Sequence, residues 1–492
     1  MPPLEKLDPA DAWQPWRPTP NDPWSRKWAA HLYRRAAFGA SRTELIEAER
    51  LGPDGTLDLL LKGRPEAAEI DKSLADIGRV AAGRDDNGEQ LRSWWLYCML
   101  QGKHPLREKM TLFWHNHFAT SIVKVQNALL MFRQNWLLRT HALGHFGPML
   151  QAISRDGAML IWLDANNNVK GKPNENYARE LMELFSLGVG NYTEQDIREA
   201  ARAFTGWHVN GEGFRFNARE HDDGPKTVLG KTGPWDGGDI VRIVLEQPAA
   251  AHFLVRKLYH YLVNEQSEPP DSFLDPLCES FRKSDYDIAA LLKTMLSSRH
   301  FYSDYAFRQR VKSPVEFVLG AVQAVYGRFG EDDPAYRPLP QQVLVRWLDS
   351  MGQSLFAPPN VKGWPGALTW LNTSTVLERN NFATALALGT LWTNATAARA
   401  FGKPVPRDDF AEEAPPAKAF DPARLLQEEK ASKPEEAAGA LLNLYLPGSI
   451  RSEAKEKLVA FVAEGNPVGP ALERRAREVV HAILTMPEYQ MA

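Results

Sequence analysis

The sequence has very few cysteines and no long apolar segment. Cys98 and Cys278 are the only cysteines among 492 residues, too few for a disulfide framework or a thiolate metal cluster. No apolar run approaches the roughly 20 residues that a helix needs to cross a bilayer. The N-terminus lacks a basic stretch followed by an apolar one. The sequence as it stands therefore predicts a cytoplasmic protein, or an exported one whose leader has been removed.

Charge of one sign is not concentrated anywhere in the chain. The 58 basic and 61 acidic side chains give a formal net charge of −3, and no Lys/Arg-rich run stands out. Neither a nucleic-acid groove nor an attachment to anionic membranes is therefore expected. The sequence also lacks the G-x-S-x-G, P-loop and dinucleotide-binding patterns. The partner that remains is a small-molecule or glycan ligand.

Apolar residues recur at helical spacing along most of the chain. Met110, Phe113, Trp114 and His117, for example, share one face of a helix that includes Arg107. The segments GFRF (213–216) and KTVLG (226–230) have the pattern of short strands, and the polar stretch REHDDGP between them predicts one small hairpin. We expect a mainly α, multi-helix globular fold with a small β-hairpin and a C-terminal helical unit.

The length of the chain suggests two or three packed units. Composition divides it into an extended N-terminal arm (1–25), a main helical domain that carries the polar site (26–401), a Pro- and charge-rich linker (402–436) and a C-terminal helical unit (437–492).

Local signals place several helix ends. One helix is expected from about Asn174 to Leu187, closed by Gly188. The next begins at Thr193, with Asp196 as the reciprocal partner of a capping box. Asp239 is expected to cap a short helix further along the chain.

Glu180 is the leading candidate for proton transfer. On the helix that contains it, Glu175, Arg179 and Glu183 step by four along the exposed side, as in an ion-pair ladder. Glu180 instead falls at the edge of the apolar face, where burial raises a carboxyl pKa into the range of a general acid or base. The alternative is a Glu that reaches solvent or pairs with an Arg.

Three further polar residues are candidates for assisting Glu180. His117 lies on an apolar helix face, as either a core histidine with one hydrogen-bond partner or a neutral imidazole used in proton transfer. His221 and Asp222 lie in the polar connection of the expected hairpin. They form either a solvated turn or a His/Asp pair carried into a cleft.

An Asn-rich stretch follows the spacing of a calcium-binding loop imperfectly. Asp164, Asn166, Asn168 and Glu175 occupy positions 1, 3, 5 and 12 of the EF-hand pattern. Val169 stands where that pattern has Gly, and two lysines and a proline interrupt it. The alternative is an Asn-rich turn that holds no ion.

Aromatic, amide and cationic residues gather in loop-like sequence around NVKGWPG (360–366). Trp rings stack on sugars, while amide and cationic groups bind hydroxyl or carboxylate groups. The expected substrate-binding residues are Asn174, Asn176, Trp207, Lys362, Trp364, Trp370, Arg379 and Asn380, with the three Trp as stacking surfaces. The alternative is a loop that only packs between helices.

Long segments spread over nearly the whole chain carry a family resemblance. They are HLYRRAAFGAS (31–41), REKMTLFWHNHFAT (107–120), the stretch from Lys170 to Trp207, HDDGPKTVLG (221–230), FAPPNVKGWPG (356–366) and the terminal PEYQ. In these segments the chain resembles the bacterial family known as domain of unknown function 1800. The resemblance implies no particular activity. It does favour Glu180, His117, His221 and Asn174–Asn176 as functional residues, because they fall inside the shared segments.

The leading functional hypothesis is a hydrolase-type enzyme that uses Glu/His acid–base chemistry on a carbohydrate. Glu180 would be the acid or base, assisted by His117, His221 and Asp222. One alternative is an enzyme that uses a single divalent metal ion, bound by His117, His221 and a carboxylate. Another is a non-catalytic binding or scaffold protein.

Overall fold

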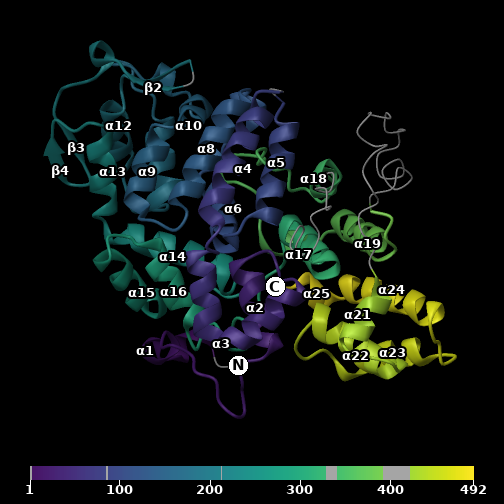
Figure 1. The fold of residues 1–492 in the computed structure, drawn as a ribbon. Coiled ribbons are helices and arrows are strands. Elements are labelled where there is room, and N and C mark those ends of the chain that lie inside the picture. The colour runs from purple at the N-terminus through teal and green to yellow at the C-terminus, as the bar shows by residue number, and fades with distance from the viewer. Residues whose placement is uncertain (1–2, 85–86, 212, 328–340, 392–420) are drawn as a thin grey trace.

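A computed structural model describes residues 3–84, 87–211, 213–327, 341–391 and 421–492 (Figure 1). Within these ranges the protein is mainly α-helical, which confirms the expected fold class. None of the described helices is long and apolar enough to span a bilayer. The first helices are η1 (Leu4–Lys6), α1 (Pro9–Ala12), α2 (Arg26–Ala36), α3 (Arg42–Lys62), α4 (Ala67–Ala82), α5 (Glu89–Gln101), α6 (Pro105–His117), α7 (Ile122–Val125), α8 (Ala128–His141), α9 (Phe146–Ser154) and α10 (Gly157–Trp162).

The middle of the chain continues with shorter helices around two hairpins. Its helices are η2 (Ala165–Asn167), α11 (Asn176–Glu180), the π-helix η3 (Leu181–Ser186), α12 (Glu194–Ala203), η4 (Ala218–Glu220), α13 (Gly237–Leu245), α14 (Pro248–Leu262), α15 (Asp271–Lys283), α16 (Ile288–Ser297) and α17 (Pro314–Tyr326). The remaining helices are α18 (Gln341–Ser350), η5 (Ala367–Trp370), α19 (Thr373–Ala387), α21 (Pro422–Glu428), α22 (Pro434–Tyr445), α23 (Ser452–Ala463), α24 (Pro470–Thr485) and α25 (Pro487–Gln490).

Helix α6 lies in the centre of the helical body. It packs against α5 and α8, and α4 packs against both of these helices (Figure 1). His104 accepts a hydrogen bond from Arg107 N at the start of α6, and Pro105 occupies its first turn, where the missing N–H costs nothing. Because α6 is buried on nearly all sides, even its last turn lies inside the protein.

The expected pairing of the strands was wrong. Gly213–Phe216 (β2) pairs with Trp207–Asn210 (β1), and Lys226–Val228 (β3) pairs with Lys231–Gly233 (β4), both antiparallel. Each strand thus pairs with its nearest neighbour in sequence, since closing a short loop costs less entropy than closing a longer one. The polar stretch 217–225 joins two small hairpins and is not the tip of one.

Local capping signals were confirmed at one helix and corrected at another. Thr193 and Asp196 form the expected reciprocal capping box at the start of α12. Asp236, and not Asp239, is the N-cap of α13. Asp239 sits three residues further on and accepts a hydrogen bond from the Asp236 backbone.

The N-terminal segment is packed onto the body. Trp13 and Trp16 are buried, and Trp13 Nε1 donates a 2.8 Å hydrogen bond to Phe273 O. An isolated bridge joins Pro15 to Ser298. The segment is therefore anchored by its aromatic residues, although it holds only short helices.

The C-terminal helices α21 to α24 gather on one side of the molecule (Figure 1). Helix α24 packs against α19 of the body and against α22. Of the expected linker, residues 402–420 lie outside the described residues. The remainder, 421–436, contains α21 and the start of α22, and Leu426 within it is buried.

Candidate functional site

The last turn of α6 brings His117 against the end of the π-helix η3. His117 is 5% exposed, and its Nε2 lies 3.0 Å from Phe185 O. Its Nδ1 lies 3.2 Å from Lys257 Nζ on α14. Because an ammonium group only donates, Nδ1 accepts and Nε2 carries the hydrogen that is donated to Phe185 O. Burial, and then the neighbouring Lys257, lower the pKa of His117 well below its ordinary value, so the imidazole is neutral.

The π-helix leaves carbonyl groups at its end that other elements bind. Lys257 Nζ donates to Leu184 O at 3.1 Å, beside the contact from His117 to Phe185 O. Within the helical segment itself, the Ser186 hydroxyl donates to Leu181 O. Side chains from α6 and α14 thus satisfy the last carbonyls of η3, as basic residues commonly do at helix C-termini. Single-turn π segments occur frequently at functional sites.

Lys257 is a lysine without an acidic partner. Within the described ranges no carboxylate lies within ion-pair distance of its Nζ, which sits 4.6 Å from the centre of the Phe253 ring. Burial lowers the pKa of Lys257 to about 8. The side chain therefore holds its proton weakly next to a neutral histidine.

Glu180 presents a half-buried carboxyl group at the junction of α11 and η3. Burial, and then the charge of Glu183, raise the pKa of Glu180, while Arg179 and Lys362 oppose the shift. Among the described residues the Glu180 carboxylate has no hydrogen-bond or ion-pair partner. Its oxygens are therefore available to a ligand.

Glu183 does not extend the expected ion-pair ladder. It accepts a 3.0 Å hydrogen bond from the Tyr192 hydroxyl, whereas Arg179 pairs with Glu175 and Glu194. The π-helix explains the difference, because its wider turn shifts every following residue around the helix axis. Glu183 thus lies close enough to Glu180 to raise the pKa of that group.

The loop 360–366 packs against the end of α6. Trp364 N donates a 2.6 Å hydrogen bond to Asn116 Oδ1. Gly363 has a φ of +86°, and a Cβ at this position would overlap the side chain of Asn116. This close approach places exposed Lys362 near Glu180, where the charge of Lys362 opposes the rise in the pKa of Glu180. Three segments far apart in sequence, around Asn116–His117, Glu180–Phe185 and Lys362–Trp364, are in this way joined through contacts.

His221 and Asp222 are held at the end of α12. His221 Nδ1 lies 2.9 Å from Thr205 O, just after α12. Asp222 forms an ion pair at 2.8 Å with Arg202 of α12, whose guanidinium lowers the pKa of Asp222 to about 2. These contacts attach the stretch 217–225 to α12. In the described part of the chain, neither residue forms a hydrogen bond or ion pair with Glu180 or His117.

The side chains of the suggested calcium loop are bound to protein groups. Asn166 and Asn168 accept hydrogen bonds from Val209 N and Asn174 N. Asp164 pairs with Lys124, and Glu175 pairs with Arg179. Across the described part of the chain, no group of three or more His, Cys, Asp or Glu side chains is arranged to hold a metal ion.

Most of the expected substrate-binding residues lie in packed positions. Trp207, Trp364 and Trp370, the expected stacking surfaces, are only 4–5% exposed. Arg379 is 2% exposed and donates to Gln490 Oε1 and Lys312 O. Asn380 is exposed on α19.

Asn174 and Asn176 lie just before and at the start of α11. Asn174 Nδ2 donates to Asp164 O, and its Oδ1 accepts from Asn176 N. Asn174 therefore shapes the turn, while the exposed Asn176 side chain sits one turn before Glu180. Among the expected binding residues, Lys362 and Asn176 are exposed and lie beside Glu180, Lys362 on the neighbouring loop and Asn176 on the same helix.

Sequence reasoning missed Lys257 and Tyr192. Lys257 is the one charged position on a helical face that also carries Phe253, four residues before it, and Tyr261, four residues after it. A cation at such a position is a usable signal, because lysine is rarely buried without a partner. Tyr192 lies in the loop before α12. Residue spacing in a loop could not predict that the Tyr192 hydroxyl binds Glu183.

Comparisons with known proteins point to one family. No curated protein and no solved structure matches the chain. Residues 31–491, nearly the whole sequence, match the model of the family described as protein of unknown function, DUF1800. The chain therefore belongs to the DUF1800 family.

Proposed function

We propose that this protein is a hydrolase-type enzyme in which Glu180 is the general acid. The observation that supports the proposal is the state of the Glu180 carboxyl, which is half-buried, has a raised pKa and has no partner among the described residues. A structural glutamate would pair with a donor. A carboxyl group whose pKa is raised keeps its proton to a higher pH, and the protonated form can protonate a leaving group.

Glu183 is the second carboxylate of the proposed site. Its Oε2 is held by the Tyr192 hydroxyl at 3.0 Å, so its orientation is fixed. A pair of carboxyl groups in unlike environments is the arrangement by which glycoside hydrolases divide the acid role from the role of base or nucleophile. We therefore assign the acid role to Glu180, the second role to Glu183, and a glycosidic bond as the substrate.

His117 and Lys257 act in this proposal as positioning residues. Their hydrogen bonds to Phe185 O and Leu184 O hold the end of the helical segment that carries both glutamates. Phe185 lies five residues after Glu180, roughly 7 Å along the axis of a helix, so the hydrogen bond to Phe185 O acts on Glu180 through the helix backbone. Lys362, on the exposed loop beside Glu180, would contact substrate hydroxyl groups.

The test compares Glu180→Gln with Glu175→Gln on a panel of chromogenic glycosides and esters. Both substitutions replace a carboxylate by an amide of similar volume on neighbouring turns, but Glu175 is already paired with Arg179. Glu180→Gln should lower kcat by about 10²–10⁴-fold, the usual contribution of a proton-transfer group. Glu175→Gln should keep kcat within about twofold of the parent, because an exposed ion pair contributes little.

Three results would contradict the proposal. Parental activity in a folded Glu180→Gln variant would remove Glu180 from the mechanism. Turnover of esters but of no glycoside would contradict the substrate class. Glycan binding that is equally tight in parent and variant, without turnover, would identify a binding protein instead.

A further inference from the structure

A cluster of buried cations lies between the body and the C-terminal helices. We define this cation cluster as Arg34 on α2, Arg308 and Lys312 in the segment before α17, and Arg379 on α19. Lys312 is 6% exposed and Arg379 is 2% exposed. Burial lowers the pKa of Lys312 well below its ordinary value, and the charges of Arg34, Arg379 and Arg308 lower it further. The three arginines are thus close enough to Lys312 for their charges to act on it.

The neighbouring carboxylates are bound to other partners. Glu316 accepts from Lys109 and lies 3.0 Å from Arg310 Nη1, and it also accepts from Ser313 N. Glu488 pairs with Arg451 at 3.5 Å. Over the ranges that the structure describes, no carboxylate lies within ion-pair distance of any of the four cations of the cluster. The cluster therefore carries uncompensated positive charge.

Several donors in the cluster have no acceptor. Arg34 Nε and Nη2 and Arg379 Nε are buried without a hydrogen-bond partner in the described structure. The Tyr445 hydroxyl, close enough to Tyr489 for that group to raise its pKa, is also buried without a partner. Lys312 Nζ lies 3.5 Å from the centre of the Tyr489 ring. Buried donors and cations are normally paired. Several unpaired ones in one place therefore indicate a site for an acceptor from outside the chain.

We propose that the cation cluster is a binding site for a phosphate group. A phosphate offers several strong acceptor oxygens and about two negative charges, which match donors that approach from separate helices. A single carboxylate would satisfy one guanidinium fork and leave the other cations unpaired. The site is separate from Glu180 and does not depend on the function proposed for that residue.

The position of the cluster gives phosphate binding a structural consequence. Arg379 Nη1 donates to Gln490 Oε1, Lys312 N donates to Gln490 O, and Arg308 donates to Ser449 O. The residues that would bind phosphate are therefore the same ones that attach α25 and the end of α22 to the body. Bound phosphate should hold these helices more firmly in place.

The experiment measures the melting temperature of the full chain in increasing phosphate, with potassium chloride keeping the ionic strength constant. Inorganic phosphate and glycerol phosphate are the two probes, because they separate a site for the free ion from a site for a phosphate ester. Either probe, or both, should raise the parent's Tm by about 2 °C or more as the site fills, which chloride alone should not do.

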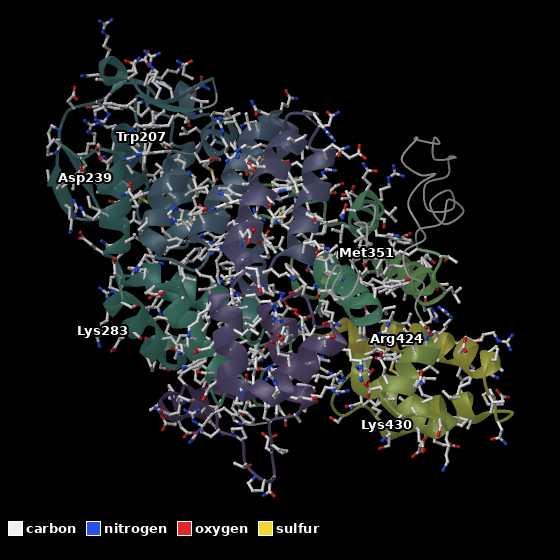
Figure 2. All side chains as sticks on the ribbon, in the orientation of Figure 1. Trp207, Asp239, Lys283, Met351, Arg424 and Lys430 are labelled. Atoms are coloured by element: carbon white, nitrogen blue, oxygen red, sulfur yellow. The ribbon has the colours of Figure 1, made fainter. Side chains whose placement is uncertain are left out.

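Lys312→Met and Arg34→Met test the residues, and Lys283→Met is the matched control. Lys283 is the last residue of α15, and its side chain is 78% exposed (Figure 2). Lys312→Met and Arg34→Met should each weaken phosphate binding, measured by calorimetry, by about tenfold or more, the effect of losing one charge-assisted contact. Lys283→Met should bind phosphate like the parent.

The stability of the variants without phosphate is a second readout. Each variant removes an uncompensated buried charge, so its Tm in chloride should equal or exceed that of the parent. Phosphate binding as tight as that of the parent in either folded cluster variant would overturn the proposal. Failure of both variants to fold would also overturn it, because it would show that the cations already have partners that the fold needs.

Discussion

The carboxyl group of Glu180 makes the stability of the fold depend on pH. Its pKa is raised in the folded protein, first by burial and then by Glu183. The folded state therefore keeps the Glu180 proton to a higher pH than the unfolded chain does. The stability that follows is fully present below the unfolded pKa and is lost as the pH rises through the folded pKa. An ionised Glu180 beside Glu183 consequently destabilises the fold at neutral pH.

The variant Glu180→Gln should remove this pH dependence. The amide keeps the shape of the side chain and carries no charge, so at neutral pH the variant should melt at the same temperature as the parent or higher. At a pH below the unfolded pKa of about 4.3, where the parent is protonated, the two Tm values should converge. Melting curves across that range measure the difference directly.

A comparison with Glu175→Gln makes the result specific to Glu180. Glu175 is paired with Arg179, so its removal should lower the Tm slightly at neutral pH. If Glu180→Gln instead melts clearly below the parent at neutral pH, Glu180 is a stabilising partner of some donor. The acid–base assignment would then be wrong.

At the scale of single elements, the sequence located α11 and η3 but not their geometry. Helical periodicity and the expected stop at Gly188 placed the segment within two residues of its observed limits. The π-turn could not be predicted from the spacing of apolar residues, because one wider turn leaves the apolar face nearly continuous. The π-turn nevertheless determines that Glu183 is hydrogen-bonded to Tyr192 and is not paired with Arg179. The same holds for the strands, whose residues were recognised while their partners were not.

The loop 360–366 depends on one glycine. Gly363 has a φ of +86°, and a Cβ there would overlap Asn116 Oδ1 and lie 2.6 Å from Asn116 O. Gly363→Ala should therefore lower the free energy of unfolding by about 2–4 kcal/mol, from backbone strain and overpacking together. Urea denaturation monitored by tryptophan fluorescence would measure the loss, since Trp364 is the next residue.

Gly366 in the same loop is the matched control. Its φ is −121°, and a Cβ at this position would meet nothing within 4 Å. Gly366→Ala should change the free energy of unfolding by no more than about 0.5 kcal/mol. Equal effects at Gly363 and Gly366 would show that the loop is not held against α6 in the way described.

At the scale of the whole molecule, the class of fold could be predicted and the assembly could not. Periodic apolar residues determine that helices form, but which faces meet depends on packing over hundreds of residues. The meeting of Asn116, Glu180 and Lys362 therefore needed the structure. So did the attachment of His221 to Thr205 at the end of α12.

The N-terminal segment shows the same limit. Pro, Trp and Asp in residues 1–25 predicted an extended arm, and composition could not show that the Trp side chains are anchors. Trp13 packs on Phe273 with ring centres 5.0 Å apart and on His300 at 5.3 Å. The segment thereby joins α15 to the end of α16, two elements that are remote from it in sequence.

Trp13→Ala tests whether this anchor stabilises the whole molecule. Truncation of a buried Trp should cost about 3–5 kcal/mol in the free energy of unfolding, because it leaves a cavity against Phe273 and His300. Trp13→Phe is the control. It keeps a ring in the site and loses the hydrogen bond to Phe273 O, at a cost of about 1–2 kcal/mol. Chemical denaturation of the full chain gives both values. A loss below about 1 kcal/mol for Trp13→Ala would mean that residues 1–25 contribute little to the fold and behave as the arm that their composition predicted.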